Sequence, residues 1–293
     1  MQFTGAITAL ATPFKNGQID EEGFRNLIEW QIQEGIDGLV PVGTTGEKAT
    51  LTHEEYEKAV KICVDQVKKR VPVIAGAGSN NTVEAVELLK FVKRAGADAG
   101  MMLSPYYNKP TQEGVYQHFK AIGKAVPGFP MVIYNVPGRT GLNMLPKTVA
   151  RMARDIPEVV AVKEACGNIE QIAEVMEYAP AGFTCLSGDD SMVLAAMALG
   201  AKGVISVASN IVPRQVHELC EACLKDDMVK ARELFYWLSP INRACFYETN
   251  PGPVKTALGL MGKLEFSLRL PLVPMAENTE QALRDVLKNA KLI

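Results

Sequence analysis

A lysine stands directly after a short apolar stretch near the middle of the chain. Residues 159–162 are all apolar and precede Lys163, a pattern typical of a strand buried on both faces of a parallel sheet. An amine held at the end of such a strand is partly removed from water, which lowers its pKa and frees it to attack a carbonyl carbon. The alternative is that Lys163 extends its charged end into water and does no chemistry.

Five other polar residues that could support carbonyl chemistry follow predicted strands, and they are Thr44, Thr45, Tyr107, Tyr134 and Arg139. A tyrosine hydroxyl can supply the proton that loss of water from a carbinolamine requires, and threonine can relay it. Backbone N–H groups around the two threonines could hold the carboxylate of a 2-oxo acid, and the arginine could bind a second carboxylate. Each residue alone is more typical of an ordinary polar strand end, but together they fit imine chemistry.

The strands and helices that must position these residues are predicted from a regular alternation along the sequence. Short apolar runs alternate with longer amphipathic segments, which favours a parallel sheet. Eight runs are predicted as strands, at residues 7–12, 38–42, 71–76, 99–104, 131–135, 159–165, 183–186 and 203–207. Eight such units predict an α/β protein with a (β/α)8 TIM barrel, whose active site lies at the C-terminal ends of the strands. A doubly wound sheet is the alternative, but no GxGxxG follows the first strand.

The chain continues beyond the predicted barrel without a linker or a change of composition. Helical periodicity resumes in three segments that begin near Met228, Val254 and Ala276. We therefore expect a barrel catalytic domain at residues 1–225 and a C-terminal helical region at residues 226–293 packed on it.

Charge and composition argue against several classes of partner. The net charge is -2, so no basic surface for nucleic acid or an anionic membrane is expected. The first residues lack the pattern of a signal peptide, and no apolar run is long enough to span a bilayer. A cytoplasmic protein is the expectation.

No metal and no cofactor are expected. The glycine loop at residues 43–47 lacks the Gly-Lys-Ser/Thr ending of a nucleotide-binding loop. Asp189 and Asp190 are predicted to cap the next helix rather than to bind a divalent metal. Cys220 and Cys223 form a CxxC inside a helical pattern with no second ligand pair nearby, which argues against zinc.

Four motifs in this chain resemble those of the dihydrodipicolinate synthase family, which belongs to the pyruvate-dependent class I aldolases. They are Gly-Thr-Thr-Gly-Glu at 43–47, Ser-Pro-Tyr-Tyr-Asn-Lys-Pro at 104–110, Tyr-Asn-Val-Pro-Gly-Arg-Thr at 134–140 and Val-Lys-Glu-Ala at 162–165. The resemblance covers essentially the whole chain. It implies a Schiff-base lyase that condenses pyruvate with L-aspartate 4-semialdehyde in lysine and diaminopimelate biosynthesis.

The resemblance also implies which residues are catalytic. Lys163 would form the Schiff base with pyruvate, and Tyr134 would act as the general acid and base. Thr44 would relay protons together with Tyr107, which in the family comes from a neighbouring subunit. A homotetramer built as a dimer of dimers is the expected assembly.

Further residues are implied to bind the substrates. Thr45 would hold the pyruvate carboxylate, and Arg139 would hold the carboxylate of the semialdehyde. Ile205 and Gly188 would line the pocket through backbone groups.

Two alternative functions remain at this stage. N-acetylneuraminate lyase and 2-keto-3-deoxy sugar-acid aldolases share the lysine, the tyrosine and the glycine loop, but they generally lack an arginine at the position of Arg139. A non-catalytic keto-acid sensor would keep the barrel without turnover, and it should have lost at least one of the residues named above.

A site for feedback inhibition by lysine is also implied by the resemblance. The matching residues are Ala49, His53, Asn80, Glu84 and Tyr106. Sensitive bacterial relatives often carry a small residue and a histidine where this chain has Lys48 and Tyr56. Because the Lys48 ammonium could repel a bound lysine, weak or absent inhibition is expected.

Overall fold

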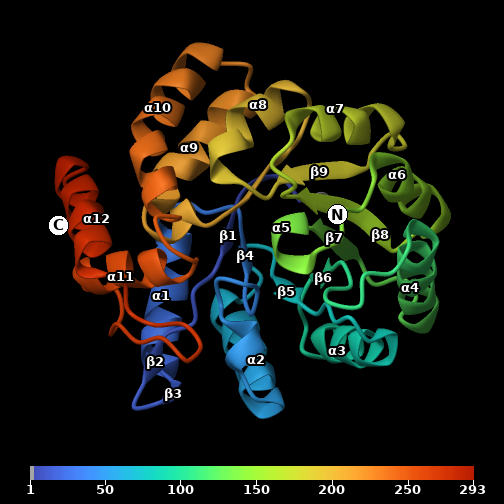
Figure 1. Ribbon diagram of the computed structural model, residues 1–293, viewed down its shortest axis with the longest axis horizontal. Helices are drawn as coiled ribbons and strands as arrows, with labels where there is room; N and C mark the ends of the chain where they lie inside the picture. The colour runs from blue at the N-terminus through green and yellow to red at the C-terminus, as the bar shows by residue number, and fades with distance from the viewer. Residues whose placement is uncertain (1–2) are drawn as a thin grey trace.

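The computed structural model describes residues 3–293, with a sheet of eight parallel strands at the centre and helices around it (Figure 1). The strands, in their order around the sheet, are β4 (Gly38–Val40), β1 (Gly5–Ala9), β10 (Gly203–Ser206), β9 (Thr184–Ser187), β8 (Val159–Glu164), β7 (Met131–Asn135), β6 (Ala99–Leu103) and β5 (Ile74–Gly76). A parallel bridge between Leu39 and Val73 joins the two ends of this order. The sheet therefore closes, and the predicted (β/α)8 barrel is confirmed.

Helices follow the strands, and all of them except the one-turn α5 form the outer layer of the barrel (Figure 1). They are α1 (Glu21–Gln33), α2 (His53–Val67), α3 (Thr82–Arg94), α4 (Gln112–Ala125), α5 (Pro137–Thr140), α6 (Pro146–Asp155), α7 (Ile169–Tyr178), α8 (Val193–Ala198) and α9 (Pro213–Leu224). Three short 3-10 helices are η1 (Lys48–Thr50), η2 (Asp190–Met192) and η3 (Ala208–Asn210). The helix starts follow local chemistry: Thr52 and Glu55 form a reciprocal capping box at α2.

The C-terminal region contains three longer helices, close to where periodicity predicts them. These are α10 (Met228–Ala244), α11 (Gly252–Leu260) and α12 (Glu277–Asn289). Helix α10 packs against α9 and α8, and α12 packs against α10 and α11. The C-terminal helices therefore lie beside the N-terminal and C-terminal parts of the barrel rather than apart from it (Figure 1).

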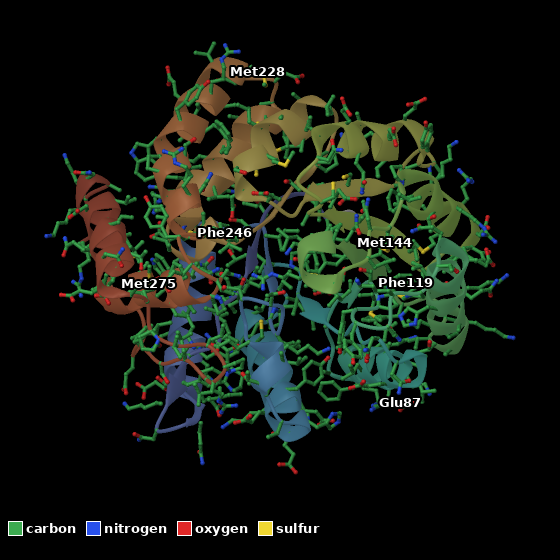
Figure 2. All side chains as sticks on the ribbon, in the orientation of Figure 1. Glu87, Phe119, Met144, Met228, Phe246 and Met275 are labelled. Atoms are coloured by element: carbon green, nitrogen blue, oxygen red, sulfur yellow. The ribbon has the colours of Figure 1, made fainter. Side chains whose placement is uncertain are left out.

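Two apolar clusters hold the layers together. One fills the barrel interior and includes Ile7, Leu186 and Ile205. The other lies between the strands and the helices, where Phe119 and Met144 are buried (Figure 2). Because both faces of each strand are buried, one in each cluster, the strands have nearly continuous apolar sequences.

The structure also departs from the predictions in a few places. Two elements were not predicted, the hairpin of β2 (Phe14–Lys15) and β3 (Gln18–Ile19) and the one-turn helix α5. The prediction for Asp190 was wrong, because its buried carboxylate accepts the backbone N–H groups of Val207 and Ala208. Asp189 does cap a helix, the 3-10 helix η2.

Neither a membrane span nor a metal cluster is found in the part of the chain that the structure describes. None of its helices combines the length and the apolar character needed to cross a membrane. Within residues 3–293, no group of three or more His, Cys, Asp or Glu side chains could hold a metal ion.

Candidate active site

Lys163 and Tyr134 lie inside the barrel at the carboxyl ends of β8 and β7. They are register partners in neighbouring strands, so both side chains point to the same face of the sheet. The Nζ atom of Lys163 lies 4.2 Å from the centroid of the Tyr134 ring. Both residues are buried, with 5% and 6% of their surface exposed. The fold therefore places the amine against the aromatic ring that carries the hydroxyl needed for imine chemistry.

The surroundings of Lys163 favour its neutral form. Burial is the main cause that lowers the pKa of this ammonium group to about 8, while Asp190 and Asp189 raise it and Arg139 lowers it. At pH 7 about one amine in ten is then neutral, against fewer than about one in a thousand for an ordinary lysine. No hydrogen-bond partner of the Nζ atom is found within residues 3–293, so no group there occupies the lone pair of the neutral amine.

The Tyr134 hydroxyl responds to burial in the opposite direction. Burial raises the pKa of Tyr134 to about 12, against smaller lowering effects of Arg139 and of a hydrogen bond with Thr44. The hydroxyl therefore stays protonated at physiological pH. A protonated phenol beside an amine can donate to a departing hydroxyl group, and Thr44 can carry the proton onward.

The loop after β4 presents backbone donors to the same region. The N–H groups of Thr44 and Thr45 have no backbone acceptor within residues 3–293. The Thr45 side chain is buried, and its hydroxyl accepts a hydrogen bond from the amide nitrogen of Asn250 at 3.0 Å. A Cβ atom at Gly46 would lie 3.0 Å from the backbone nitrogen of Val42, so the tight turn leaves no room for a side chain there. Successive free N–H groups of this kind are suited to bind a carboxylate.

Arg139 lies on α5, the one-turn helix directly after β7. Its Nη2 atom donates to the backbone carbonyl of Asn250 at 3.4 Å, and it forms no ion pair with any carboxylate in residues 3–293. The guanidinium group is exposed, yet it borders a cavity that Thr44 and Tyr134 also line. An arginine at a cavity edge that no carboxylate of the described chain neutralises is available for the carboxylate of a ligand.

Gly188 lies near Lys163, and Ile205 lies in the same apolar cluster as Tyr134. A Cβ atom at Gly188 would come within 3.2 Å of the Lys163 Cε atom and 2.6 Å of the Ala165 side chain. Glycine is therefore the residue that lets the end of β9 pass close to the lysine. Ile205 is buried in the apolar cluster inside the barrel, which also contains Tyr134.

Tyr107 lies apart from the other predicted catalytic residues within this chain. Its residue surface is 89% exposed, and its φ angle is +70°. It does not line the cavity, whereas its neighbour Tyr106 does. A role for Tyr107 within its own subunit is therefore not supported, and a role in another subunit stays a prediction.

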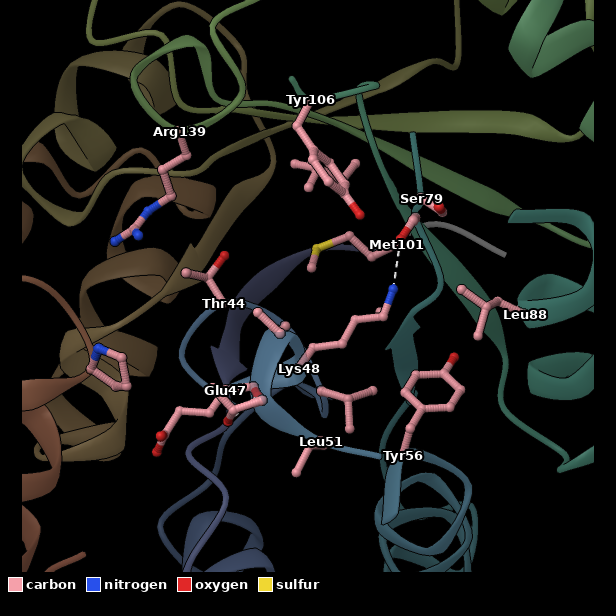
Figure 3. A pocket seen from close by; sticks show the side chains of 18 of the residues that line it. Thr44, Glu47, Lys48, Leu51, Tyr56, Ser79, Leu88, Met101, Tyr106 and Arg139 are labelled. Atoms are coloured by element: carbon pink, nitrogen blue, oxygen red, sulfur yellow. Dashed lines mark hydrogen bonds between the residues drawn. The ribbon is translucent and has the colours of Figure 1, made fainter. Parts of the chain in front are cut away.

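A cavity of about 550 Å³ connects this region with a second one (Figure 3). Thr44, Tyr134 and Arg139 line one part of it. Four of the five residues predicted for a lysine site also line the cavity, namely Ala49, His53, Glu84 and Tyr106. The fifth, Asn80, does not line it but donates a hydrogen bond to the backbone carbonyl of Tyr106 at 3.1 Å.

Lys48 occupies the second part of the cavity. Its Nζ atom donates to the backbone carbonyl of Gly78 at 2.5 Å and lies 5.6 Å from the Tyr56 ring centroid (Figure 3). Burial lowers the pKa of Lys48 to about 8, and the charge of Glu84 raises it in part. The ammonium group is therefore held in place by the protein itself.

Comparisons with known proteins agree with this geometry. Residues 2–290 match the model of the Dihydrodipicolinate synthetase family. The chain belongs to this family. It is 59% identical to the 4-hydroxy-tetrahydrodipicolinate synthase of Nitratidesulfovibrio vulgaris (strain Miyazaki F), with all of both chains aligned.

Two solved structures of dihydrodipicolinate synthases show the same fold. The enzyme from Aquifex aeolicus has a TM-score of 0.97 at 46% identity, and 99% of each chain is covered. The chloride-inhibited enzyme from Acinetobacter baumannii, complexed with pyruvate, has a TM-score of 0.97 at 42% identity, with 100% of each chain covered.

Sequence reasoning missed three residues near the site of this dihydrodipicolinate synthetase family member. Asn250 bonds to Thr45, while Glu47 and Lys255 form an ion pair directly behind the glycine loop. Lys255 stands alone among apolar and small residues in α11, and that pattern could have indicated a buried charge with a partner. The partner itself could not be named from the pattern.

Proposed function

We propose that this chain is a 4-hydroxy-tetrahydrodipicolinate synthase, a lyase that condenses pyruvate with L-aspartate 4-semialdehyde in lysine and diaminopimelate biosynthesis. The observation that carries the proposal is the Lys163 amine, whose pKa is lowered to about 8, beside the buried Tyr134 hydroxyl. Full-length relatives of that name support it. The reaction needs no further cofactor, because an imine on the enzyme itself draws electrons from the adjacent carbon.

The first step joins Lys163 to pyruvate. The neutral Nζ atom attacks the ketone carbon, and the resulting carbinolamine loses its hydroxyl group as water. Tyr134 donates the proton to the leaving oxygen, and Thr44 connects it to Tyr107 of a neighbouring subunit. The N–H groups of Thr44 and Thr45 hold the pyruvate carboxylate, which fixes the ketone in front of the amine.

The second step forms the carbon–carbon bond. The iminium group allows the pyruvate methyl carbon to lose a proton, and the enamine so formed attacks the aldehyde of the second substrate. Arg139 binds the carboxylate of that substrate through charge-assisted hydrogen bonds. The amino group of the adduct then attacks the imine carbon and displaces Lys163, closing the ring. Gly188 and Ile205 line this space.

Turnover with different substrates tests the function. With pyruvate present, we expect product formation that depends on L-aspartate 4-semialdehyde, and no cleavage of N-acetylneuraminate or 2-keto-3-deoxy sugar acids. Cleavage of a sugar acid without semialdehyde turnover would assign the chain to the other aldolases. Pyruvate bound on Lys163 without any turnover would favour a sensor.

We also propose that the chain forms a homotetramer, a dimer of dimers. The exposed Tyr107 and the exposed Leu270, with 89% and 79% of their surfaces accessible, support a partner surface near the cavity. Sedimentation equilibrium should give four times the 31.9 kDa chain mass. A monomer that is fully active would contradict both the assembly and the proposed role of Tyr107.

We propose weak or absent inhibition by lysine. The Lys48 ammonium lies in the cavity part that Ala49, His53, Glu84 and Tyr106 border, so a free lysine would meet a like charge there. Asn80 is held by the Tyr106 carbonyl beside it. Titration of the turnover assay with L-lysine tests this, and half-maximal inhibition at submillimolar lysine would contradict it.

We propose a cytoplasmic location and a two-part chain. All six cysteines are free thiols, which supports a reducing compartment. Residues 1–225 would form the barrel domain and residues 226–293 the helical region, a boundary that falls between α9 and α10. Cell fractionation checks the location.

A further inference from the structure

An ion pair is buried behind the loop that carries Thr44 and Thr45. The Nζ atom of Lys255, on α11, lies 2.5 Å from the Oε1 atom of Glu47, and both side chains are 0% exposed. The other oxygen of Glu47 accepts the backbone N–H of Arg269 at 3.2 Å. Two groups of the C-terminal region therefore hold one carboxylate of the barrel.

The backbone of this loop is strained. Val42 and Glu47 have φ angles of +50° and +54°, which are unfavourable for residues other than glycine and most of all for β-branched ones. Such conformations persist only where several surrounding contacts enforce them. Glu47 is one of these two strained residues, and its side chain is held by Lys255 and by the Arg269 N–H. It directly follows the turn whose Thr44 and Thr45 N–H groups are free.

The C-terminal region makes two more contacts with the cavity edge. Asn250 donates to the Thr45 hydroxyl at 3.0 Å, and its backbone carbonyl accepts from Arg139 at 3.4 Å. Asn250 stands five residues before Lys255 in sequence, so one segment reaches the loop at two points. The groups assigned to the two substrate carboxylates are thus linked to the same C-terminal segment.

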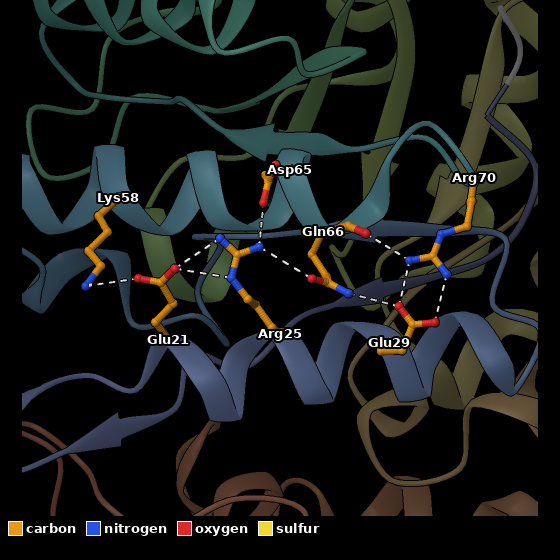
Figure 4. A network of polar contacts seen from close by, with 7 residues as sticks. All are labelled: Glu21, Arg25, Glu29, Lys58, Asp65, Gln66 and Arg70. Carbon is orange, nitrogen blue, oxygen red and sulfur yellow. Dashed lines mark hydrogen bonds and ion pairs between the residues drawn. The ribbon is translucent and has the colours of Figure 1, made fainter.

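Stability alone does not account for the buried pair. A buried ion pair often contributes no more to the free energy of unfolding than an apolar pair of the same volume. Its best-supported role is to select one conformation of the surrounding chain among several. The network of Glu29 on α1 and Arg70 after α2 differs, since 32% and 38% of these side chains are exposed to solvent, against 0% for Glu47 and Lys255 (Figure 4). Neither Glu29 nor Arg70 lines the cavity.

We propose that Glu47 and Lys255 are positioning residues, through which the C-terminal helical region holds the Thr44–Thr45 backbone in the arrangement that binds the pyruvate carboxylate. The inference rests on the proposed function and adds residues that touch no substrate. It assigns the helical region a part in catalysis, although all reacting groups come from the barrel.

The test replaces the ion pair without leaving a buried charge. In the double variant Glu47→Gln/Lys255→Met, volume is nearly kept and the glutamine can still accept from Arg269. We expect the KM for pyruvate to rise about 10–100-fold, since small misplacements of binding groups have effects of this order. The KM for the semialdehyde and the pH profile of turnover should change little, and thermal melting should remain cooperative.

A milder variant covers the case in which the double variant does not fold. Glu47→Asp keeps both charges but shortens the side chain by one methylene group, which weakens its contacts with Lys255 and with the Arg269 N–H, and we expect a several-fold rise in the KM for pyruvate. The control is Glu29→Gln/Arg70→Met in the partly exposed network, which should leave that KM unchanged.

The outcomes separate the two proposals. Wild-type protein that shows neither pyruvate trapping on Lys163 nor turnover would refute the proposed function. Normal wild-type turnover with an unchanged KM for pyruvate in a folded variant would overturn the positioning role alone. Equal losses for both substrates, together with a lower melting temperature, would also overturn it, because that pattern indicates general loosening.

Discussion

The buried Lys163 and the half-buried Lys48 lie in adjoining parts of this molecule, and removal from water lowers the pKa of each to about 8. The Nζ atom of Lys48 is bonded to the Gly78 carbonyl, and Glu84 contributes a charge nearby. The Nζ atom of Lys163 faces the Tyr134 ring at 4.2 Å. The same pKa therefore occurs in two very different settings.

The comparison shows that a lowered pKa does not by itself make a nucleophile. A reactive amine also needs a free lone pair, a proton donor for the leaving hydroxyl and a group that aligns the ketone. The barrel mouth supplies these groups around Lys163. The part of the cavity around Lys48 supplies instead a carbonyl that keeps its ammonium group engaged.

The largest effect should come from removing the nucleophile. Lys163→Ala should lower kcat/KM by about 10⁴-fold or more, because no imine can form. A steady-state assay measures this, with circular dichroism as the control for folding. Activity within tenfold of wild type would contradict the assignment of Lys163 as the nucleophile, since another amine would then have to form the imine.

Removing the proton donor should have the next largest effect. Tyr134→Phe keeps the ring beside Lys163 but loses the hydroxyl, so kcat should fall by about 10²–10⁴-fold. The same variant should bind pyruvate with little change in affinity. Rapid-quench measurement of imine formation would locate the loss in the dehydration step.

Arg139 should affect one substrate only. Arg139→Ala removes charge-assisted hydrogen bonds to a carboxylate, and the KM for L-aspartate 4-semialdehyde should rise about 10–150-fold. The KM for pyruvate should change less than threefold or so. Equal increases for both substrates would contradict the separate assignment of the two carboxylates.

The pH dependence of imine formation follows from the lowered pKa of Lys163. The neutral amine is the reactive form, so the rate should rise about tenfold per unit below pH 8 and level off above it. Tyr134, with its pKa raised to about 12, stays protonated over this range. Stopped-flow measurement with pyruvate tests this, and a rate that still rises steeply at pH 10 would contradict it.

The smallest effect should come from the second lysine. Lys48→Ala removes an ammonium group that touches no reacting atom, so turnover should stay within about twofold of wild type. This result would sharpen the contrast between the two lysines. A large loss of kcat would mean that the two parts of the cavity are coupled more closely than their contacts indicate.

The barrel and the residues at its mouth could be predicted because the patterns behind them are local. Apolar runs indicate the strands, and residues directly after a strand must lie at one end of the barrel. The Glu47–Lys255 pair could not be predicted, since its members are 208 residues apart and only the closed fold brings them together. Asp190 was wrongly assigned for a similar reason, because its backbone partners belong to the next strand unit.

The placement of Tyr107 shows a further limit of sequence patterns. Tyr107 follows β6 closely, so the sequence pattern indicates a strand-end residue. In the single chain its φ angle is positive and its side chain is exposed to solvent. A pattern along one chain carries no information about which side chains a second chain would cover.

The most direct test of the central claim is borohydride trapping with pyruvate, followed by peptide mass spectrometry that reports on Lys163 and Lys48 separately. We expect a reduced pyruvyl adduct on Lys163 alone, formed faster as the pH rises toward 8. An adduct on Lys48, or no adduct on Lys163, would contradict it.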